Sequence, residues 1–178
     1  MKHIEKTNPG ISMIELLLVF LIVTALVVVV FFVASTGEQS GVITNEKQNL
    51  GILQTGIRNI YEGGNSFNGV GNKIILDADV IPFQMRGADD GQIISKWGDV
   101  TVSSHRIRNE ADSYEIRYTH VPKVYCAKLT PLMASSFSEV LVNGVILKNI
   151  DNNDINVAQV VSACNLSETD NTILFIGR

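Results

Sequence analysis

The sequence contains few of the residues on which most catalytic and ligand-binding sites depend. Its 14 Lys and Arg are outnumbered by 18 Asp and Glu, which gives a net charge of −4. The basic residues form no cluster, so nucleic acid is not expected as the main partner, because phosphate binding draws on clustered positive charge. The two cysteines and three scattered histidines cannot complete a tetrahedral zinc site or a catalytic triad. We therefore expect no catalytic residue, no metal, no cofactor and no enzymatic activity.

Three segments come close to known site motifs but lack an essential residue of each. Residues 64–68 read Gly-Asn-Ser-Phe-Asn, with asparagine where the serine-hydrolase turn needs its second glycine. Residues 69–71 read Gly-Val-Gly and continue without the later glycine of nucleotide-binding loops. Residues 151–154 read Asp-Asn-Asn-Asp, but the next calcium ligand and the loop glycine are missing, which favours a solvated turn.

What the sequence does contain is a long uncharged run near its N-terminus. Leu16 to Ala34 carries no charge, and as a helix it would extend about 29 Å, close to the hydrocarbon thickness of a bilayer. Lys2, His3 and Lys6 precede it, and positive charge on a short flank favours keeping that flank in the cytoplasm. The run is therefore expected to span a membrane, with the C-terminal part of the chain on the outer side.

Glu15 stands immediately before this run, where a carboxylate requires a physical explanation. Deep in a bilayer it would cost about 3 kcal/mol, so its presence indicates a cation that neutralises it. A plain membrane anchor, in which Glu15 reaches back to the membrane surface, is the alternative. Ordinary signal cleavage after the run is a further alternative.

The residues around Glu15 resemble the class III leader of type IV prepilins, with a short basic segment, Gly10, an apolar Ile11, and a glutamate four residues later. The resemblance implies that a prepilin peptidase cuts after Gly10 and methylates the new N-terminal amine of Ile11. It also implies that Glu15 neutralises the N-terminal amine of a neighbouring subunit as a filament assembles. Residues 1–10 would be the cleaved leader, and residues 11–36 a hydrophobic transmembrane and assembly helix.

Residues 37–178 would form one periplasmic or extracellular globular domain, which includes the second half of the long helix. The chain's two cysteines, Cys126 and Cys164, lie in this part. Because export places them in an oxidising space, we predict a disulfide between them. Closing that loop would stabilise the fold by about 4 kcal/mol. Two buried free thiols are the alternative.

One long helix is predicted from Ile11 to about Tyr61, with an apolar stripe along its second half. Gly37 and Gly41 lie between the two halves, and each weakens a helix by about 1 kcal/mol relative to alanine. Bending or local melting there is one expectation, and a small kink without function is the other. The stripe consists of Ile43, Leu50, Leu53, Ile57 and Ile60.

After a glycine- and asparagine-rich loop at residues 62–72, the β-strand patterns are short. In the segment 114–121, apolar and polar residues alternate as in a half-buried strand. Asn143-Gly144 stands between two apolar runs and predicts an antiparallel hairpin over residues 139–148. Further strands are predicted at 99–103 and 172–176.

Two helices are predicted in the C-terminal half, at residues 122–137 and 155–163. Pro131 interrupts the first, which therefore kinks there or restarts with Thr130 as its N-cap. The disulfide would link these two helices.

This order of elements resembles the type IVb pilins, and above all the major pilins of conjugative-plasmid thin pili and their enterobacterial relatives, which also carry an element like Trp97-Gly98. The resemblance implies an α+β type IV pilin fold. In that fold the second half of the long helix packs on an antiparallel sheet, and a disulfide closes the C-terminal region.

The expected function is that of a structural subunit, a major pilin, which assembles into a helical surface filament for adhesion, aggregation or conjugative mating contact. The implied partners are copies of the same chain, the prepilin peptidase, the assembly platform and its ATPase, and the inner membrane before assembly. A pseudopilin of a type II secretion system, a minor pilin and a membrane-anchored enzyme are the alternatives.

Overall fold

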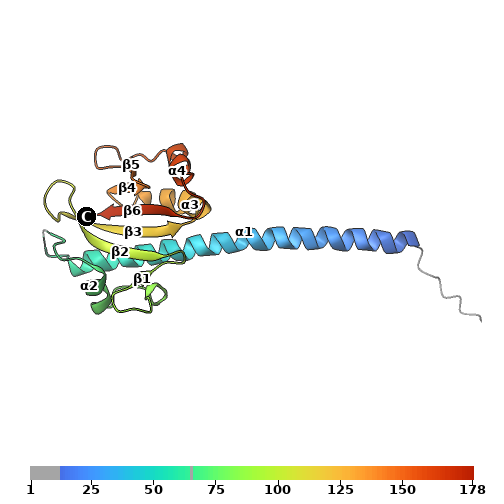
Figure 1. Ribbon diagram of the computed structural model, residues 1–178, viewed down its shortest axis with the longest axis horizontal. Coiled ribbons are helices and arrows are strands. Elements are labelled where there is room, and N and C mark those ends of the chain that lie inside the picture. Colours follow the sequence, from blue (N-terminus) through green and yellow to red (C-terminus); the bar gives the residue numbers. More distant parts are fainter. Residues whose placement is uncertain (1–12, 65) are drawn as a thin grey trace, which may run out of the picture. The chain divides into compact units, whose positions relative to one another are not determined.

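A computed structural model describes residues 13–64 and 66–178, and the chain divides into two compact units, Met1–Ser40 and Gly41–Arg178. The long helix α1, Met13–Ile60, contributes to both units (Figure 1). The predicted long helix is therefore confirmed over the described residues, and it runs unbroken past Gly37 and Gly41.

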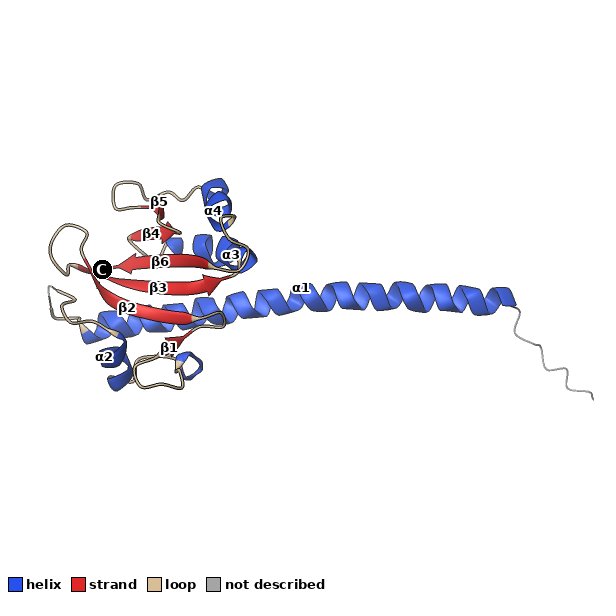
Figure 2. Ribbon diagram, in the orientation of Figure 1, coloured by secondary structure: helices blue, strands red, loops and turns tan. Residues whose placement is uncertain are grey.

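All remaining elements belong to the unit Gly41–Arg178, and the predicted α+β class is confirmed (Figure 2). The helices are α2 (Asn72–Asp77), η1 (Phe83–Met85), α3 (Lys123–Ala134) and α4 (Val157–Cys164). The strands are β1 (Ile93–Ile94), β2 (Asp99–His105), β3 (Ser113–Val121), β4 (Glu139–Val142), β5 (Val145–Lys148) and β6 (Asn171–Gly177).

The strands form one six-stranded sheet in the order β1-β2-β3-β6-β4-β5, in which every neighbouring pair is antiparallel. The last strand in the sequence, β6, therefore lies inside the sheet, between β3 and β4 (Figure 1). Phe175 on β6 is in register with Ile116 on one side and Val140 on the other. All three side chains are buried, so this line crosses the centre of the core.

The second half of α1 supplies the helical side of the core. Leu50, Leu53 and Ile57 are completely buried and belong to the same apolar cluster as the sheet residues. The predicted apolar stripe is confirmed for these residues and for Ile43, but it is wrong for Ile60, which is 37% exposed. The reason is that α1 ends at Ile60. The side chain of the next residue, Tyr61, packs against the core there instead.

Helix α3 continues through Pro131 as a single helix, so the predicted restart at Thr130 is wrong. Pro131 lies in the last turn, where its missing N–H removes one hydrogen bond from the end of the helix. Thr130 is inside the helix and fully buried, so it does not act as an N-cap. The helix ends at Ala134 rather than at the predicted Phe137.

The predicted hairpin is confirmed by β4 and β5, which pair across a two-residue turn. Asn143 and Gly144 have φ angles of +50° and +80°. Positive φ at both central residues is what a type I′ turn requires, and Asn-Gly is the pair that adopts it most readily. The short elements α2, η1 and β1 were not predicted.

Candidate functional site: the apolar segment and the disulfide region

The first candidate site is the apolar segment of α1, Met13–Val29. Its large apolar side chains are between 50% and 83% exposed in the isolated chain. Glu15 is the only charged residue of the segment and is also exposed. The Thr24 hydroxyl bonds to the carbonyl oxygens of Phe20 and Leu21 at 2.9 Å, which satisfies this polar group within the helix. The segment thus offers an apolar surface with one carboxylate near its start.

The predicted processing residues Gly10 and Ile11 lie outside the described residues, so their roles remain predictions, as does the role of Glu15 in assembly. Judged on the described residues, no helix combines the length and the hydropathy that crossing a membrane requires.

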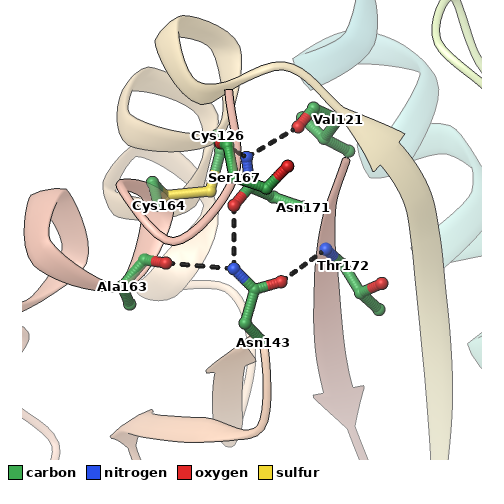
Figure 3. The surroundings of a disulfide bond; sticks show 8 residues. All are labelled: Val121, Cys126, Asn143, Ala163, Cys164, Ser167, Asn171 and Thr172. Atoms are coloured by element: carbon green, nitrogen blue, oxygen red, sulfur yellow. Dashed lines mark hydrogen bonds between the residues drawn. A yellow bond between two sulfur atoms is a disulfide. The ribbon is translucent and has the colours of Figure 1, made fainter. Parts of the chain in front are cut away.

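The second candidate site is the disulfide region, in which Cys126 of α3 is bonded to Cys164 of α4 (Figure 3). Their Cα atoms are 5.8 Å apart, a usual separation for a disulfide, and both residues are completely buried. The predicted pairing and the predicted link between the two helices are confirmed. The alternative of two free thiols is therefore wrong.

Two asparagine side chains join the hairpin turn to the disulfide region (Figure 3). Asn143 Nδ2 donates to the carbonyl oxygen of Ala163 at 3.0 Å and to Asn171 Oδ1 at 2.8 Å. Asn143 Oδ1 accepts the backbone N–H of Thr172 at 2.9 Å. The Asn143 amide therefore connects the β4–β5 turn with both α4 and β6.

Asn171 extends this network and is itself completely buried. Its Nδ2 donates to the carbonyl oxygens of Val121 at 3.0 Å and Ser167 at 2.8 Å. Sequence reasoning identified Asn143 as a turn residue but missed its side-chain network and Asn171, because all of these contacts except the one to Ser167 join residues 20 to 50 positions apart.

Glu46 is a buried carboxylate that sequence reasoning also missed. It is 4% exposed, and its Oε1 accepts the backbone N–H of Lys96 at 2.9 Å. Burial raises the pKa of Glu46, whereas the Lys96 N–H and the Tyr118 hydroxyl oppose that rise. Tyr118 is fully buried, and burial together with the charge of Glu46 raises its pKa well above 10.0. Glu46 thereby fixes the segment before β2 to α1.

Asp112 closes the connection between β2 and β3. Its two oxygens accept the backbone N–H groups of Ile107, Arg108 and Asn109 at 2.9 to 3.0 Å. Arg178 Nη2 donates to the same carboxylate at 2.8 Å. Burial alone would raise the pKa of Asp112, but these donors outweigh it and hold that pKa well below its usual range.

Histidine and carboxylate side chains form only small groups in the described part of the chain. His105 Nδ1 lies 3.1 Å from Glu115 Oε2, and Arg117 Nη2 donates to Glu115 Oε1 at 3.0 Å. Across residues 13–64 and 66–178, no three or more His, Cys, Asp or Glu side chains gather as a metal site requires. These contacts stabilise the surface of the sheet.

Comparison with solved structures relates this fold to two pilins. One is TcpA, a type IV pilin from the Vibrio cholerae El Tor biotype, with a TM-score of 0.61, 11% identity, and coverage of 78% of this chain and 99% of TcpA. The other is a type IVb pilin from Salmonella typhi, with a TM-score of 0.59, 18% identity, and coverage of 74% and 97%. The chain therefore has the fold of a type IV pilin.

The sequence profile described as PilS N terminal matches residues 41–178. The chain therefore belongs to the PilS family. A comparison with curated proteins found no match.

Proposed function

We propose that the chain is the major subunit of a type IVb pilus and that it assembles through its N-terminal helix into a helical surface filament. The observation that supports this proposal is the apolar segment Met13–Val29, whose large side chains are at least half exposed. Exposed apolar surface costs about 25 cal/mol per Å² in water. Such a segment must therefore be covered, first by the lipid of the inner membrane and then by copies of itself.

In this proposal the precursor lies in the inner membrane, with its N-terminus in the cytoplasm and its C-terminal domain in the periplasm. The prepilin peptidase cuts after Gly10 and methylates the amine of Ile11. Glu15 then pairs with the Ile11 amine of a neighbouring subunit. Moving the helix from lipid into a bundle of helices changes its apolar surroundings little. The cost of burying the Glu15 carboxylate away from a cation therefore becomes the main determinant of how neighbouring helices align.

Assembly of this kind requires the platform protein and ATPase of the pilus machinery. Head-to-tail contacts between identical subunits that do not close into a ring produce a helical fibre. The resulting extracellular filament would serve adhesion, aggregation or conjugative mating contact. We further propose that the subunit is not an enzyme, since the family and the solved relatives are structural pilins.

A pseudopilin of a type II secretion system and a minor pilin are the competing functions. The Cys126–Cys164 disulfide favours a pilus, because pseudopilins as a class rely less on a C-terminal disulfide. The presence of Glu15 and the single globular domain favour a major over a minor pilin.

The test compares cells that express the wild-type chain with cells that express Glu15→Ala. Sheared surface fibres are counted by electron microscopy and quantified against total subunit. Glu62→Ala serves as the matched control, because it removes an exposed carboxylate from the globular domain rather than from the apolar segment. Leader processing and membrane insertion are followed in parallel.

We expect Glu15→Ala to remain folded, inserted and cleaved but to yield at least about tenfold fewer fibres. A tenfold loss is expected if leaving the Ile11 amine of the neighbouring subunit unpaired costs about 1.4 kcal/mol. Glu62→Ala should form fibres at the wild-type level. Wild-type fibre yield from Glu15→Ala would refute the pairing role and favour the plain anchor. Absence of any fibre from the wild-type chain would favour the pseudopilin.

A further inference from the structure

The chain contains two Asn-Gly dipeptides, Asn68-Gly69 and Asn143-Gly144. Asparagine is especially prone to deamidation before glycine, because glycine has no side chain to hinder its backbone nitrogen or to restrict its conformation. The two sites have the same chemistry in an unfolded chain. The fold places them in opposite environments, so they can be compared within one molecule.

The reaction at Asn143 would proceed in two steps without an oxidant or reductant. The Gly144 nitrogen forms a bond to Asn143 Cγ, the Cγ–Nδ2 bond breaks, and ammonia leaves with the proton of the Gly144 N–H. Water then opens the cyclic imide at one of its two carbonyl carbons. The product is either aspartate or isoaspartate, with one carboxylate in place of the amide.

In the folded chain, the Asn143 side chain is held away from this reaction. Nδ2, the atom that must leave, donates two hydrogen bonds, and Oδ1 accepts a third. The backbone N–H of Asn143 also donates to the Thr172 carbonyl oxygen at 2.9 Å. Figure 3 shows the three side-chain contacts, and the amide cannot rotate toward the Gly144 nitrogen unless they break.

The partners of Asn143 belong to the segments that the disulfide holds. The Ala163 carbonyl, one of its acceptors, immediately precedes Cys164 (Figure 3). The other acceptor, Asn171, is positioned by the carbonyl oxygens of Val121 and Ser167. In the sequence, Val121 precedes α3 and Ser167 follows α4, the two helices that the disulfide links. Loss of the disulfide would therefore loosen both acceptors.

Asn68 lies in an exposed turn and has no comparable restraint. Its backbone N–H donates to Ser66 Oγ at 3.1 Å, and the turn is closed by one bond of 3.2 Å from the Val70 N–H to the Phe67 carbonyl. Within the described residues, no hydrogen bond holds the side-chain amide of Asn68. Asn68 is thus an internal reference for an unprotected Asn-Gly site.

We propose that Asn143 is a site of spontaneous deamidation that the Cys126–Cys164 disulfide keeps closed and that reduction of the disulfide opens. The change would be one-way. A carboxylate at position 143 has no N–H to donate and would place negative charge against the oxygens of Ala163 and Asn171. A chain that is reduced, deamidated and oxidised again would therefore not restore the original disulfide region.

The experiment incubates the purified full chain in detergent in mildly alkaline buffer. The deamidated fraction at Asn68 and Asn143 is followed over time by peptide mapping and mass spectrometry. One sample is oxidised, one is reduced by a dithiol that is itself oxidised in the exchange, and one is reduced and unfolded in guanidinium. Near-ultraviolet circular dichroism records whether the reduced chain without denaturant keeps its tertiary packing.

In the oxidised chain, we expect Asn143 to react about 100-fold more slowly than in guanidinium, a difference equivalent to about 3 kcal/mol. Reduction should accelerate Asn143 at least about tenfold, as expected if about one of several protecting hydrogen bonds is lost. Asn68 should react at a similar rate in all three samples. The inference is overturned by equal Asn143 rates in oxidised and unfolded chains, by no effect of reduction, or by loss of all tertiary packing on reduction.

Two variants test the network while the disulfide stays intact. Asn171→Ala removes one acceptor of Asn143 Nδ2 and should accelerate Asn143 severalfold. Ser167→Ala is the matched control, because Ser167 contributes only its backbone carbonyl to Asn171 and its hydroxyl accepts the Asp170 N–H instead. Equal Asn143 rates in these two variants would contradict the proposed protection, and so would a Ser167→Ala rate as fast as that of the unfolded chain.

Discussion

Replacement of both Cys126 and Cys164 by serine is expected to lower the free energy of unfolding by about 4 kcal/mol. The two residues are 38 positions apart. By the chain-entropy argument, releasing a loop of this length returns about 13 cal/mol/K to the unfolded chain, or about 3.9 kcal/mol at room temperature. The unit Gly41–Arg178 has about 140 residues and an unfolding entropy of about 0.29 kcal/mol/K, so the melting temperature should fall by about 13 °C.

Thermal unfolding of the full chain in detergent, followed by near-ultraviolet circular dichroism, measures this change. Reduced wild-type protein should show a similar loss without the cost of burying two serine hydroxyls. Ala163→Ser is the control for that cost, because Ala163 is buried next to Cys164 but forms no cross-link. A fall of less than about 4 °C, or about 1 kcal/mol, would show that packing rather than loop closure holds α3 and α4 together.

Mass spectrometry of the protein from cells should find a mature N-terminus at methylated Ile11, and an intact Met1 would contradict the predicted processing. Leu53→Ala should lower the free energy of unfolding in urea by about 2 to 5 kcal/mol, because Leu53 is completely buried. Its neighbour Ile52 is 44% exposed, so Ile52→Ala should cost less than about 1 kcal/mol, and equal losses would refute the assigned helix face. Asp112→Asn should lower the free energy of unfolding at neutral pH. The pKa of Asp112 is lower in the folded chain than its ordinary 3.8, which means that the ionised carboxylate stabilises the fold. Urea unfolding should show this difference shrinking as the pH falls below about 4, and a constant difference would refute the assigned contacts.

The elements that sequence analysis predicted are those whose determinants are local. The hairpin turn needs only Asn143 and Gly144, and the second half of α1 is specified by apolar residues at helical spacing. The pairing of Cys126 with Cys164 followed from having two cysteines and from the predicted export of this part of the chain. In each case the information lies within a few neighbouring residues or in the composition of the chain.

The elements that were missed depend on distant partners. Helix α2 has no side-chain cap at its start. Instead, the side-chain amide of its first residue, Asn72, donates to the Val100 carbonyl at 2.9 Å and accepts the Val102 N–H at 2.7 Å. The amide thus bonds to β2 as the backbone of an additional strand would. Strand β1 has two residues and depends on its pairing with β2 and on a bridge from Ile93 to Arg86. No local pattern indicates such contacts.

Glu46 shows a different limit of sequence reasoning. It follows Ile43 by three residues and precedes Leu50 by four, so the spacing alone places it on the buried face of α1. A charged residue at such a position is ordinarily assigned to the solvent, because burial of a carboxylate is costly without a partner. The partner is the backbone of Lys96, which only the folded structure brings near.

The position of β6 between β3 and β4 has a consequence for how the chain is made. Synthesis begins at the N-terminus, so both flanking strands leave the ribosome before the strand that separates them. Until Asn171–Gly177 appears, β3 and β4 lack their shared neighbour, and the sheet consists of two disconnected parts. Pairings across such long sequence separations form late and slowly. The order of strands thus delays completion of the sheet until Asn171–Gly177 has been synthesised, because only β6 joins its two parts.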